Sequence, residues 1–364
     1  MPTSILKRPC PPRRNRRRRA LLFFFTLTLV VTGCKQASAD KGEYAWVSAP
    51  EAALRDHVAT IYNKTGVVHN GERVQILEKT PKKPFVRVRS VRGEEGWIQD
   101  RLLVSQESHD QMDKLSLDVQ SAPAQISAVA RATVNLHVTP GRKTDHLYLL
   151  KENEKVDLIE RQLADKNGQP LNNSGSASDS GEKEDSPANK APAPEDWWLV
   201  RDAQKHAGWV LGRMLYVDVP VDVAQYAEGQ RIVAFLKLDE VPDGDQKYGE
   251  YLVLLTENKD GLPFDFNQVR VFSWNLKRHR YETAYRDHSV FGVLPAVLST
   301  EDLGKEGTVP AFTIRSKDDS GATHEQKYTF RTPIVRRVVV PGEQRPSVPH
   351  ARRRRRSRQA TSQN

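Results

Sequence analysis

The amino-acid sequence predicts a mainly β protein, in which two repeated units of short strands precede an antiparallel all-β domain. Three observations lead to this prediction. One stretch of the chain occurs twice with matching internal spacing, which indicates a repeated structural unit. Within each copy, short segments alternate apolar and polar residues, as half-buried strands do. After residue 220, similar segments recur about every ten residues between turn-forming residues, as in a sandwich or small barrel.

The repeat is clearest at the end of each copy. Gly96–Leu103 reads GWIQDRLL, and Gly208–Leu215 reads GWVLGRML. An aromatic residue stands 11 positions before each of these glycines, Phe85 in copy one and Trp197 in copy two. Equal spacing of matched residues predicts two units with the same strand order.

Copy two contains an insertion. The segment GERVQILE at 71–78 matches NEKVDLIE at 153–160 with an offset of 82, whereas the closing glycines are offset by 112, so copy two holds 30 additional residues. They lie in a Ser-, Gly-, Pro- and acid-rich stretch, which buries too little apolar surface to offset the entropy of ordering it. We expect a disordered insertion near 162–195 at a hairpin tip, where added length costs little closure entropy.

The order of these segments resembles the bacterial Src-homology-3 family, which opens on an Asn-Leu-Arg-like motif and closes on Gly-Trp-Val-x-x-x-Leu. Copy one departs from the family pattern at Phe85, where Trp is usual, and copy two departs at Asn153, where Gly is usual. Phe fills the same aromatic position, and Asn tolerates a left-handed turn. The resemblance implies two Src-homology-3-like barrels, at 44–104 and 129–219, that bind peptidoglycan stem peptides or another wall component.

The N-terminus has the features of a secretion signal. Residues 1–33 combine an arginine-rich head with a short apolar run that ends on small residues. The sequence Val-Thr-Gly-Cys resembles the bacterial lipoprotein box, which implies lipidation of Cys34 and a tether over 34–43. Lys35 follows in place of the Asp that retains enterobacterial lipoproteins in the inner membrane, which favours the outer membrane. The alternative is an ordinary signal peptide with an incidental Cys34.

Cysteine content and charge restrict the function classes. The two cysteines are Cys10, in the signal, and Cys34, so the mature chain is predicted to have neither a disulfide nor a thiol nucleophile. Bacterial Src-homology-3 units often accompany cell-wall cysteine peptidases, which makes this absence informative. The net charge of +10 belongs to the ends, because residues 1–33 carry +8 and residues 341–364 carry +6, which leaves −4 for the rest. A basic nucleic-acid-binding body is therefore not expected.

The remaining segments have simpler compositions. Residues 105–128 link the copies and are predicted to include a short helix near 106–117. Residues 221–340 form the C-terminal antiparallel β domain, with strands expected at 231–241, 249–256, 269–274, 280–286, 310–315 and 325–331. Residues 341–364 are expected to be a disordered arginine-rich tail, which either grips anionic envelope polymers or lipid heads or is simply solvated.

The sequence contains no recognisable catalytic or metal-binding motif, such as a metallopeptidase helix, nucleophile elbow, phosphate loop or dinucleotide fingerprint. His279 and His288 could form a ligand or base pair, but polar residues that flank a hairpin are the favoured interpretation. Asp243 and Asp245 could suggest calcium, but Lys247 occupies the place of a third ligand, which favours a plain turn. We therefore expect no enzyme, no metal and no cofactor.

Aromatic residues are the best candidates for binding. Alternation on a strand predicts that one of Trp197 and Trp198 is core and the other lies nearer the surface, with Trp198 the surface candidate. The predicted ligand-binding residues are Trp198, Tyr148, Tyr62, Trp97 and Trp209. The alternative for Trp97, Trp197 and Trp209 is that they only fill the barrels.

The sequence thus favours a non-enzymatic, lipid-anchored envelope protein on the periplasmic side, with peptidoglycan or an envelope protein as its partner. The runner-up is a protein-binding adaptor in which the C-terminal β domain binds and the barrels act as spacers. An envelope hydrolase with its active site in that domain is a third alternative.

Overall fold

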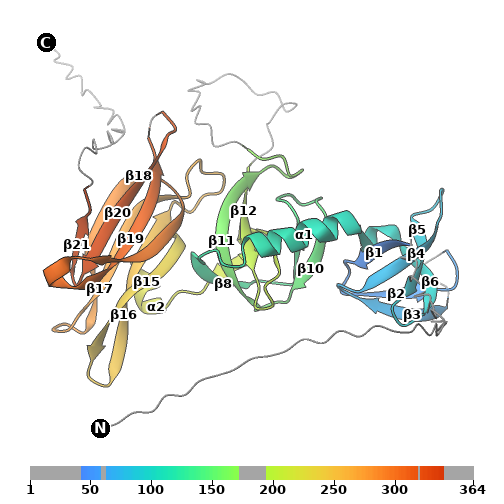
Figure 1. Ribbon diagram of the computed structural model, residues 1–364, viewed down its shortest axis with the longest axis horizontal. Coiled ribbons are helices and arrows are strands. Elements are labelled where there is room, and N and C mark those ends of the chain that lie inside the picture. Colours follow the sequence, from blue (N-terminus) through green and yellow to red (C-terminus); the bar gives the residue numbers. More distant parts are fainter. Residues whose placement is uncertain (1–41, 59–62, 172–193, 319, 340–364) are drawn as a thin grey trace, which may run out of the picture. The chain divides into compact units, whose positions relative to one another are not determined.

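The computed structural model describes residues 42–58, 63–171, 194–318 and 320–339, which form three antiparallel sheets (Figure 1). The expectation of a mainly β chain built from antiparallel strands is confirmed. Each sheet has seven strands, and its two end strands are not hydrogen-bonded to each other in the described part of the chain. In place of the expected closed barrels, each copy therefore forms a sheet whose hydrogen-bonded strands do not close into a ring.

The two copies have the same topology. The first sheet runs in the order β3-β2-β6-β5-β4-β1-β7, and the second in the order β10-β9-β13-β12-β11-β8-β14. Adding seven to each strand number of the first order gives the second. The first sheet comprises β1 (Glu43–Val47), β2 (Glu51–Arg55), β3 (Lys64–His69), β4 (Arg73–Lys79), β5 (Phe85–Ser90), β6 (Glu95–Gln99) and β7 (Leu103–Ser105), and the second comprises β8 (Ile126–Ala130), β9 (Val134–His137), β10 (His146–Leu150), β11 (Lys155–Ala164), β12 (Glu195–Arg201), β13 (Ala207–Leu211) and β14 (Leu215–Val217).

The turn before β4 and its counterpart before β11 explain why Asn can replace Gly in copy two. Gly71 has φ +76°, and Asn153 has φ +63°. Asn is the non-glycine residue that best tolerates this left-handed region. In each copy the next residue is a glutamate whose carboxylate accepts the backbone N–H of the residue three positions earlier, His69 in copy one and Lys151 in copy two.

The glycines that open the closing segments are required by close packing. A Cβ on Gly96 would lie 2.7 Å from the Cβ of Leu54, and a Cβ on Gly208 would lie 2.7 Å from the Cβ of Leu136. Real Cβ atoms do not approach this closely, so any larger residue must displace the neighbouring strand. A 3-10 turn follows each closing strand, η1 (Asp100–Leu102) or η2 (Gly212–Met214).

The linker between the copies forms the expected helix, α1 (Gln106–Asp118). The hydroxyl of Ser105 caps its first turn by accepting the N–H of Ser108 at 3.1 Å. At its other end, the buried guanidinium of Arg201 donates to the carbonyls of residues 119, 120 and 122 at 2.7 to 3.0 Å. A cation is favourable at a helix C-terminus, where carbonyl groups lack partners. Arg201 thereby fastens α1 to the second sheet.

The third sheet is a meander in which every strand pairs with the next one along the chain. The sequence predicts six or seven strands here, and seven are present among the described residues; β18 continues 16 residues past the expected end at 286, and β21 lies outside the expected ranges. The strand expected at 249–256 belongs to β16, which is second in the sheet and is buried from Leu252 onward. The strands are β15 (Arg231–Asp243), β16 (Gln246–Thr256), β17 (Phe266–Asn275), β18 (Arg280–Asp302), β19 (Thr308–Lys317), β20 (Thr323–Arg331) and β21 (Ile334–Arg337), preceded by α2 (Val221–Ala224) and η3 (Gln225–Ala227), with η4 (Gly304–Glu306) between β18 and β19.

The hydrophobic cores of the described chain do not follow the domain boundaries that the sequence predicts. Copy one has its own core, which includes Leu54, Val88 and Ile98. Copy two instead shares one continuous core with the third sheet, from Leu136 in β9 to Phe330 in β20. The expectation of two equivalent, separate barrels is therefore wrong, because apolar residues join copy two to the C-terminal domain.

A buried ion network strengthens this junction. The guanidinium of Arg161, in β11, lies 2.7 Å from a carboxylate oxygen of Asp196 and 3.0 Å from one of Asp265. Asp196 also accepts from Arg231 at 2.8 Å, and Gln125 exchanges two hydrogen bonds with the backbone of Ala296. Removing one partner of such a network leaves a charge that is both buried and uncompensated, at a cost of about 3–5 kcal/mol.

The insertion expected near 162–195 begins later in the chain than predicted. β11 extends to Ala164, where residues 162–164 pair with 195–197 of β12, and Ala164 bridges to Pro170. Strand pairing therefore orders residues 162–171, which the sequence prediction had included in the disordered insertion. The predictions for the signal, Cys34, Tyr62, residues 172–193 and the tail lie outside the described residues.

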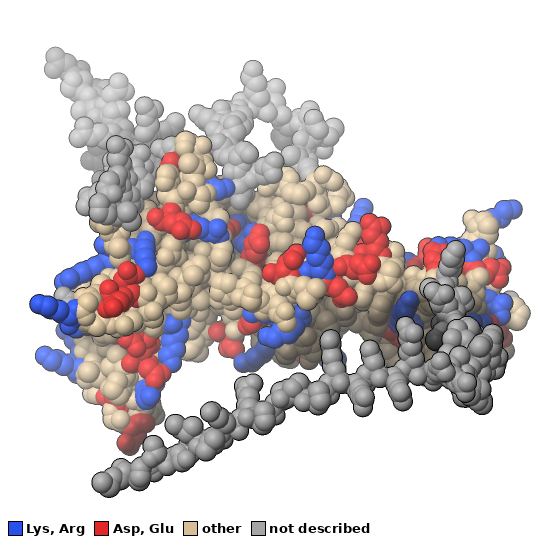
Figure 2. Space-filling view, in the orientation of Figure 1, with Lys and Arg blue, Asp and Glu red and all other residues tan. Residues whose placement is uncertain are grey.

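Charged side chains of both signs are mixed over the visible surface of the described residues (Figure 2). This distribution agrees with the small net charge calculated for the chain without its ends. Among the described residues, no helix has both the length and the apolar character needed to cross a membrane.

Candidate functional site

The strongest candidate site is the face of copy one that points away from its core. On β6, Ile98 lies in the core, so its neighbour Trp97 points to the opposite face, where it is half-buried. Strand pairing places Trp97 directly between Arg55 of β2 and Arg87 of β5. Side chains opposed in this way lie within contact distance of each other. We call Phe85, Arg87, Trp97, Gln99 and Arg55 the aromatic face.

Ion pairs hold the charged part of this face in place. The carboxylate of Glu95 forms ion pairs with the guanidinium groups of Arg87 at 3.0 Å and Arg89 at 2.6 Å. Its hydrogen bond from Arg89 is the main cause that lowers the pKa of Glu95, with the charges of both arginines adding to it. An indole flanked by guanidinium groups can stack on a sugar ring or an aliphatic chain and can bind a carboxylate.

The equivalent face of copy two is closed. Its positions carry Trp209 in place of Trp97, Leu199 in place of Arg87 and Leu211 in place of Gln99. These side chains pack with Leu115 of α1 and with Val119, directly after the helix, in a separate apolar cluster, in which Trp209 is 7% exposed. Helix α1 lies over this sheet (Figure 1). The predicted binding residue Trp209 is thus buried under the linker helix rather than inside the barrel.

Both tryptophans of β12 are buried, which corrects the expectation that one lies near the surface. Trp197 is 2% exposed in the cluster beneath α1, and Trp198 is 4% exposed on the opposite face, in the core shared with the third sheet. Alternation correctly placed the two side chains on opposite faces, but it could not show that both faces are covered. Trp198 nevertheless lines a cavity at the junction of copy two and the third sheet.

A histidine beside Trp197 has a strongly perturbed pKa. The ring of His137 lies edge-on to Trp197 with the ring centroids 5.4 Å apart, and its Nδ1 is 3.0 Å from the hydroxyl of Thr144. Burial, followed by the charge of His146, lowers the pKa of His137 from 6.5 to about 4. Its partly buried position against Trp197 and Thr144 indicates a structural role.

Tyr148 lies at the contact between the copies. Its ring stacks on His206 at 3.8 Å, and the adjacent carbonyl of Leu147 accepts a hydrogen bond from Asn70 of copy one. Burial raises the pKa of the Tyr148 hydroxyl. Trp97, Tyr148, Trp198 and Trp209 are therefore distributed over four environments and do not converge on one pocket.

The histidines of the third sheet form separate hydrogen bonds. His279 contacts Asp243 at 2.6 Å, and the same carboxylate accepts the indole N–H of Trp274 at 2.8 Å. His288 contacts Gln268 at 2.6 Å on a different pair of strands. Within the described ranges, no three His, Cys, Asp or Glu side chains are arranged to hold a metal ion.

Comparison with known proteins identifies one domain. Residues 50–104 match the family described as the bacterial SH3 domain, and this match covers every residue of the aromatic face. A comparison with curated proteins gives no match.

Solved structures provide weaker similarities. An NlpC/P60 family protein from Bacillus cereus is 12% identical with a TM-score of 0.21, over 82% of this chain and 95% of that chain. NlpC2 from Trichomonas vaginalis is 12% identical with a TM-score of 0.16, over 79% and 93%. NlpC1 from the same organism is 9% identical with a TM-score of 0.16, over 70% and 93%.

Sequence reasoning missed the partners of Trp97. A signal was present, because Arg87 stands between the two core valines of β5 and the same alternation puts Trp97 between Gly96 and Ile98. Both therefore had to point to the same outer face once β5 and β6 were paired. The sequence did not show that α1 covers the corresponding face of copy two, which leaves this face open only in copy one.

Proposed function

We propose that this protein is a non-enzymatic cell-envelope lipoprotein that binds peptidoglycan through the aromatic face of copy one. The observation that carries this proposal is the contrast between the copies. The same tryptophan position is open and flanked by arginines in copy one, but apolar and covered by α1 in copy two. Residues 50–104 also match a bacterial SH3 domain, a class that commonly binds the cell wall.

The chemistry of the aromatic face suits a stem peptide of the wall. Such a peptide offers carboxylates for guanidinium groups and aliphatic side chains for an indole surface. The backbone on both sides of Trp97 is fixed by cross-strand pairing, so the ligand orders few protein groups when it binds. The chain from Lys35 onward contains no cysteine and therefore offers no thiol nucleophile, which supports a binding role.

Copy two serves, in this proposal, as a second bacterial Src-homology-3-like unit that has become a structural spacer. Its strand order repeats that of copy one, which supports common descent of the units. Its ion network and shared core join copy two to the C-terminal domain. Helix α1 covers the face of copy two whose equivalent in copy one is open.

The lipid anchor on Cys34 and an outer-membrane location on the periplasmic side complete the proposal. They rest on the Val-Thr-Gly-Cys sequence and on Lys35. Expression of the full chain with Cys34→Ser is expected to move the protein from the membrane fraction to the soluble fraction. Persistence of the variant in the membrane fraction would contradict the anchor.

The binding proposal is tested by co-sedimentation of the full-length chain with purified sacculi. Trp97→Ala is expected to weaken retention about tenfold, because a buried aromatic contact is worth about 1.5 kcal/mol or more. Trp97→Phe should recover part of the binding. Tyr216→Ala is the matched control, because Tyr216 is an exposed aromatic residue of copy two outside the aromatic face.

Equal retention of Trp97→Ala and Tyr216→Ala would contradict the proposal. Circular dichroism and a melting curve, compared with those of the wild type, serve to check that Trp97→Ala is folded. Since Trp97 lies outside the core of copy one, its replacement is expected to leave that core intact.

A further inference from the structure

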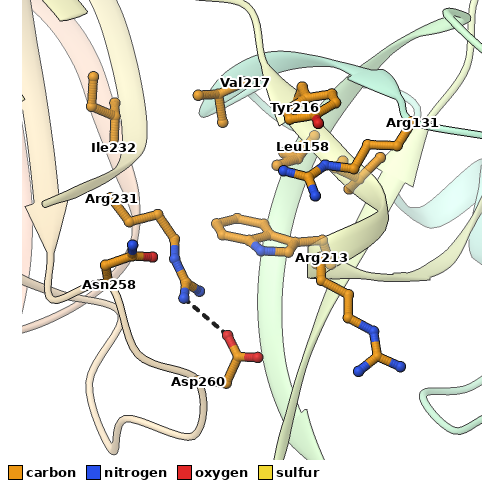
Figure 3. Close-up of a pocket in the computed structure, with 12 residues that line it drawn as sticks. Arg131, Leu158, Arg213, Tyr216, Val217, Arg231, Ile232, Asn258 and Asp260 are labelled. Carbon is orange, nitrogen blue, oxygen red and sulfur yellow. Dashed lines mark hydrogen bonds and ion pairs between the residues drawn. The ribbon is translucent and has the colours of Figure 1, made fainter. Parts of the chain in front are cut away.

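A cavity of about 460 Å³ lies where copy two meets the third sheet. Arg131 and Arg213 line it from copy two, and Arg231 and Asp260 line it from the opposite side (Figure 3). A second cavity of about 620 Å³ shares Arg213 and Asp260 with the first and adds Lys166 and Lys259. The two cavities thus have common walls. We call them together the basic groove.

The basic groove carries an excess of positive charge. Its cations are Arg131, Arg142, Lys166, Arg213, Arg231 and Lys259, and its carboxylates are Glu195 and Asp260. Arg142 pairs with Glu195, and Arg231 is shared between Asp196 and Asp260. Among the described residues, Arg131, Arg213, Lys166 and Lys259 make no ion pair with a carboxylate. Four cations therefore face a groove without compensating charge.

The cation nearest the apolar wall is already oriented. The guanidinium of Arg131 stacks over the ring of Tyr216 at 3.6 Å, which leaves its N–H groups available at the edge. The apolar wall consists of Leu158, Trp198, Leu215, Tyr216, Val217 and Ile232. An anion that is purely polar, such as a polyphosphate, would leave this wall unused.

The groove also offers main-chain groups of β14, although the N–H of Leu215 already donates to the carbonyl of Gly212. β14 is the last strand of the second sheet and pairs only with β8, so its outer edge has no strand partner among the described residues. On this edge strand, Tyr216 is 54% exposed and Val217 is 40% exposed. An unpaired edge that carries exposed apolar side chains is a template for an added strand.

We propose that the basic groove binds an extended acidic peptide, supplied by a partner protein, which adds as a strand to the edge of β14. Acidic side chains of the peptide pair with Arg213 and Arg131, and its apolar side chains contact the wall around Trp198. The charge selects an acidic ligand, while the apolar wall and the free edge together select a peptide over a polyphosphate. This site is separate from the aromatic face.

The test uses the full-length chain and a fluorescein-labelled decapeptide that alternates glutamate and valine, followed by fluorescence anisotropy. Arg213→Glu is expected to raise the Kd at least tenfold. Arg101→Glu is the matched control, because Arg101 holds the same position in copy one and is expected to change the Kd less than twofold. Arg131→Glu provides a second variant if Arg213→Glu lowers the melting temperature.

Backbone participation is tested with two N-methylated probes, one methylated at odd positions and one at even positions. Because successive N–H groups of a strand point to opposite sides, only one of these probes should lose at least tenfold in affinity. Retention on sacculi should be unchanged in Arg213→Glu, which separates this site from the proposed wall binding.

The proposal would be overturned by no measurable binding of the probe, by equal effects of Arg213→Glu and Arg101→Glu, or by binding that resists both methylation patterns. Polyphosphate of matched charge that competes as well as the unlabelled peptide would show a general anion site and would also overturn it.

Discussion

Protonation of His137 is expected to destabilise the body formed by copy two and the C-terminal domain in weakly acidic solution. Burial, followed by the charge of His146, lowers the pKa of His137 to about 4, against 6.5 for an exposed histidine. Above pH 6.5 the imidazole is neutral in both states. As the pH falls from about 6.5 to about 4, the unfolded chain binds a proton that the folded chain does not bind. Stability is therefore lost across this window and levels off below it.

The size of the effect follows from the pKa difference. Each pKa unit corresponds to about 1.4 kcal/mol, so the interval from 6.5 to about 4 is worth about 3 kcal/mol. Other groups also titrate in this range, so the useful quantity is the difference between the wild type and His137→Phe. This variant keeps a ring against Trp197 and removes the titration.

Urea unfolding at pH 7.5 and pH 4.5, followed by tryptophan fluorescence, measures the free energy of unfolding of both proteins. The wild type should lose about 2–3 kcal/mol more than His137→Phe between the two pH values. An NMR titration of the imidazole should give a midpoint near 4 in the folded protein. A midpoint near 6.5, or the same loss in both proteins, would refute the reasoning.

Three further substitutions test the packing. Gly208→Ala should destabilise by about 1–3 kcal/mol, measured by thermal unfolding, because the new Cβ meets Leu136 at 2.7 Å; an unchanged melting temperature would contradict the close packing. Arg201→Met should speed hydrogen exchange at the end of α1, because three carbonyls lose their shared donor; exchange as slow as in the wild type would show that the helix is held otherwise. Asn153→Val should cost more than Asn153→Gly in urea unfolding, since φ is +63°; equal costs would contradict the left-handed turn.

One residue of the aromatic face was predicted from the sequence as a binding residue. Trp97 was predicted as a binding residue, and the structure leaves its indole half-buried on an outer face. Trp209, at the same position of the repeat, received the same prediction, but its indole lies beneath α1. Both residues have the same local pattern, so local reasoning had no means to separate them.

The basic groove could not be predicted. Arg131 and Arg213 are 82 positions apart, and Arg231 and Asp260 belong to another sheet. Each looks like an ordinary surface charge in its own segment. Only the packing of copy two against the third sheet brings them to one cavity.

The sequence by itself determined that the two copies share one strand order, that a helix links them and that Asn153 can replace a turn glycine, because these depend on period, spacing and backbone conformation, which are local properties. The tertiary structure alone decided which copy keeps an open face. That outcome depends on where α1 packs and on which sheet shares its core with copy two, and both are contacts between segments far apart in the chain. Burial is a property of the assembled fold, so two copies of one motif can differ in what they expose.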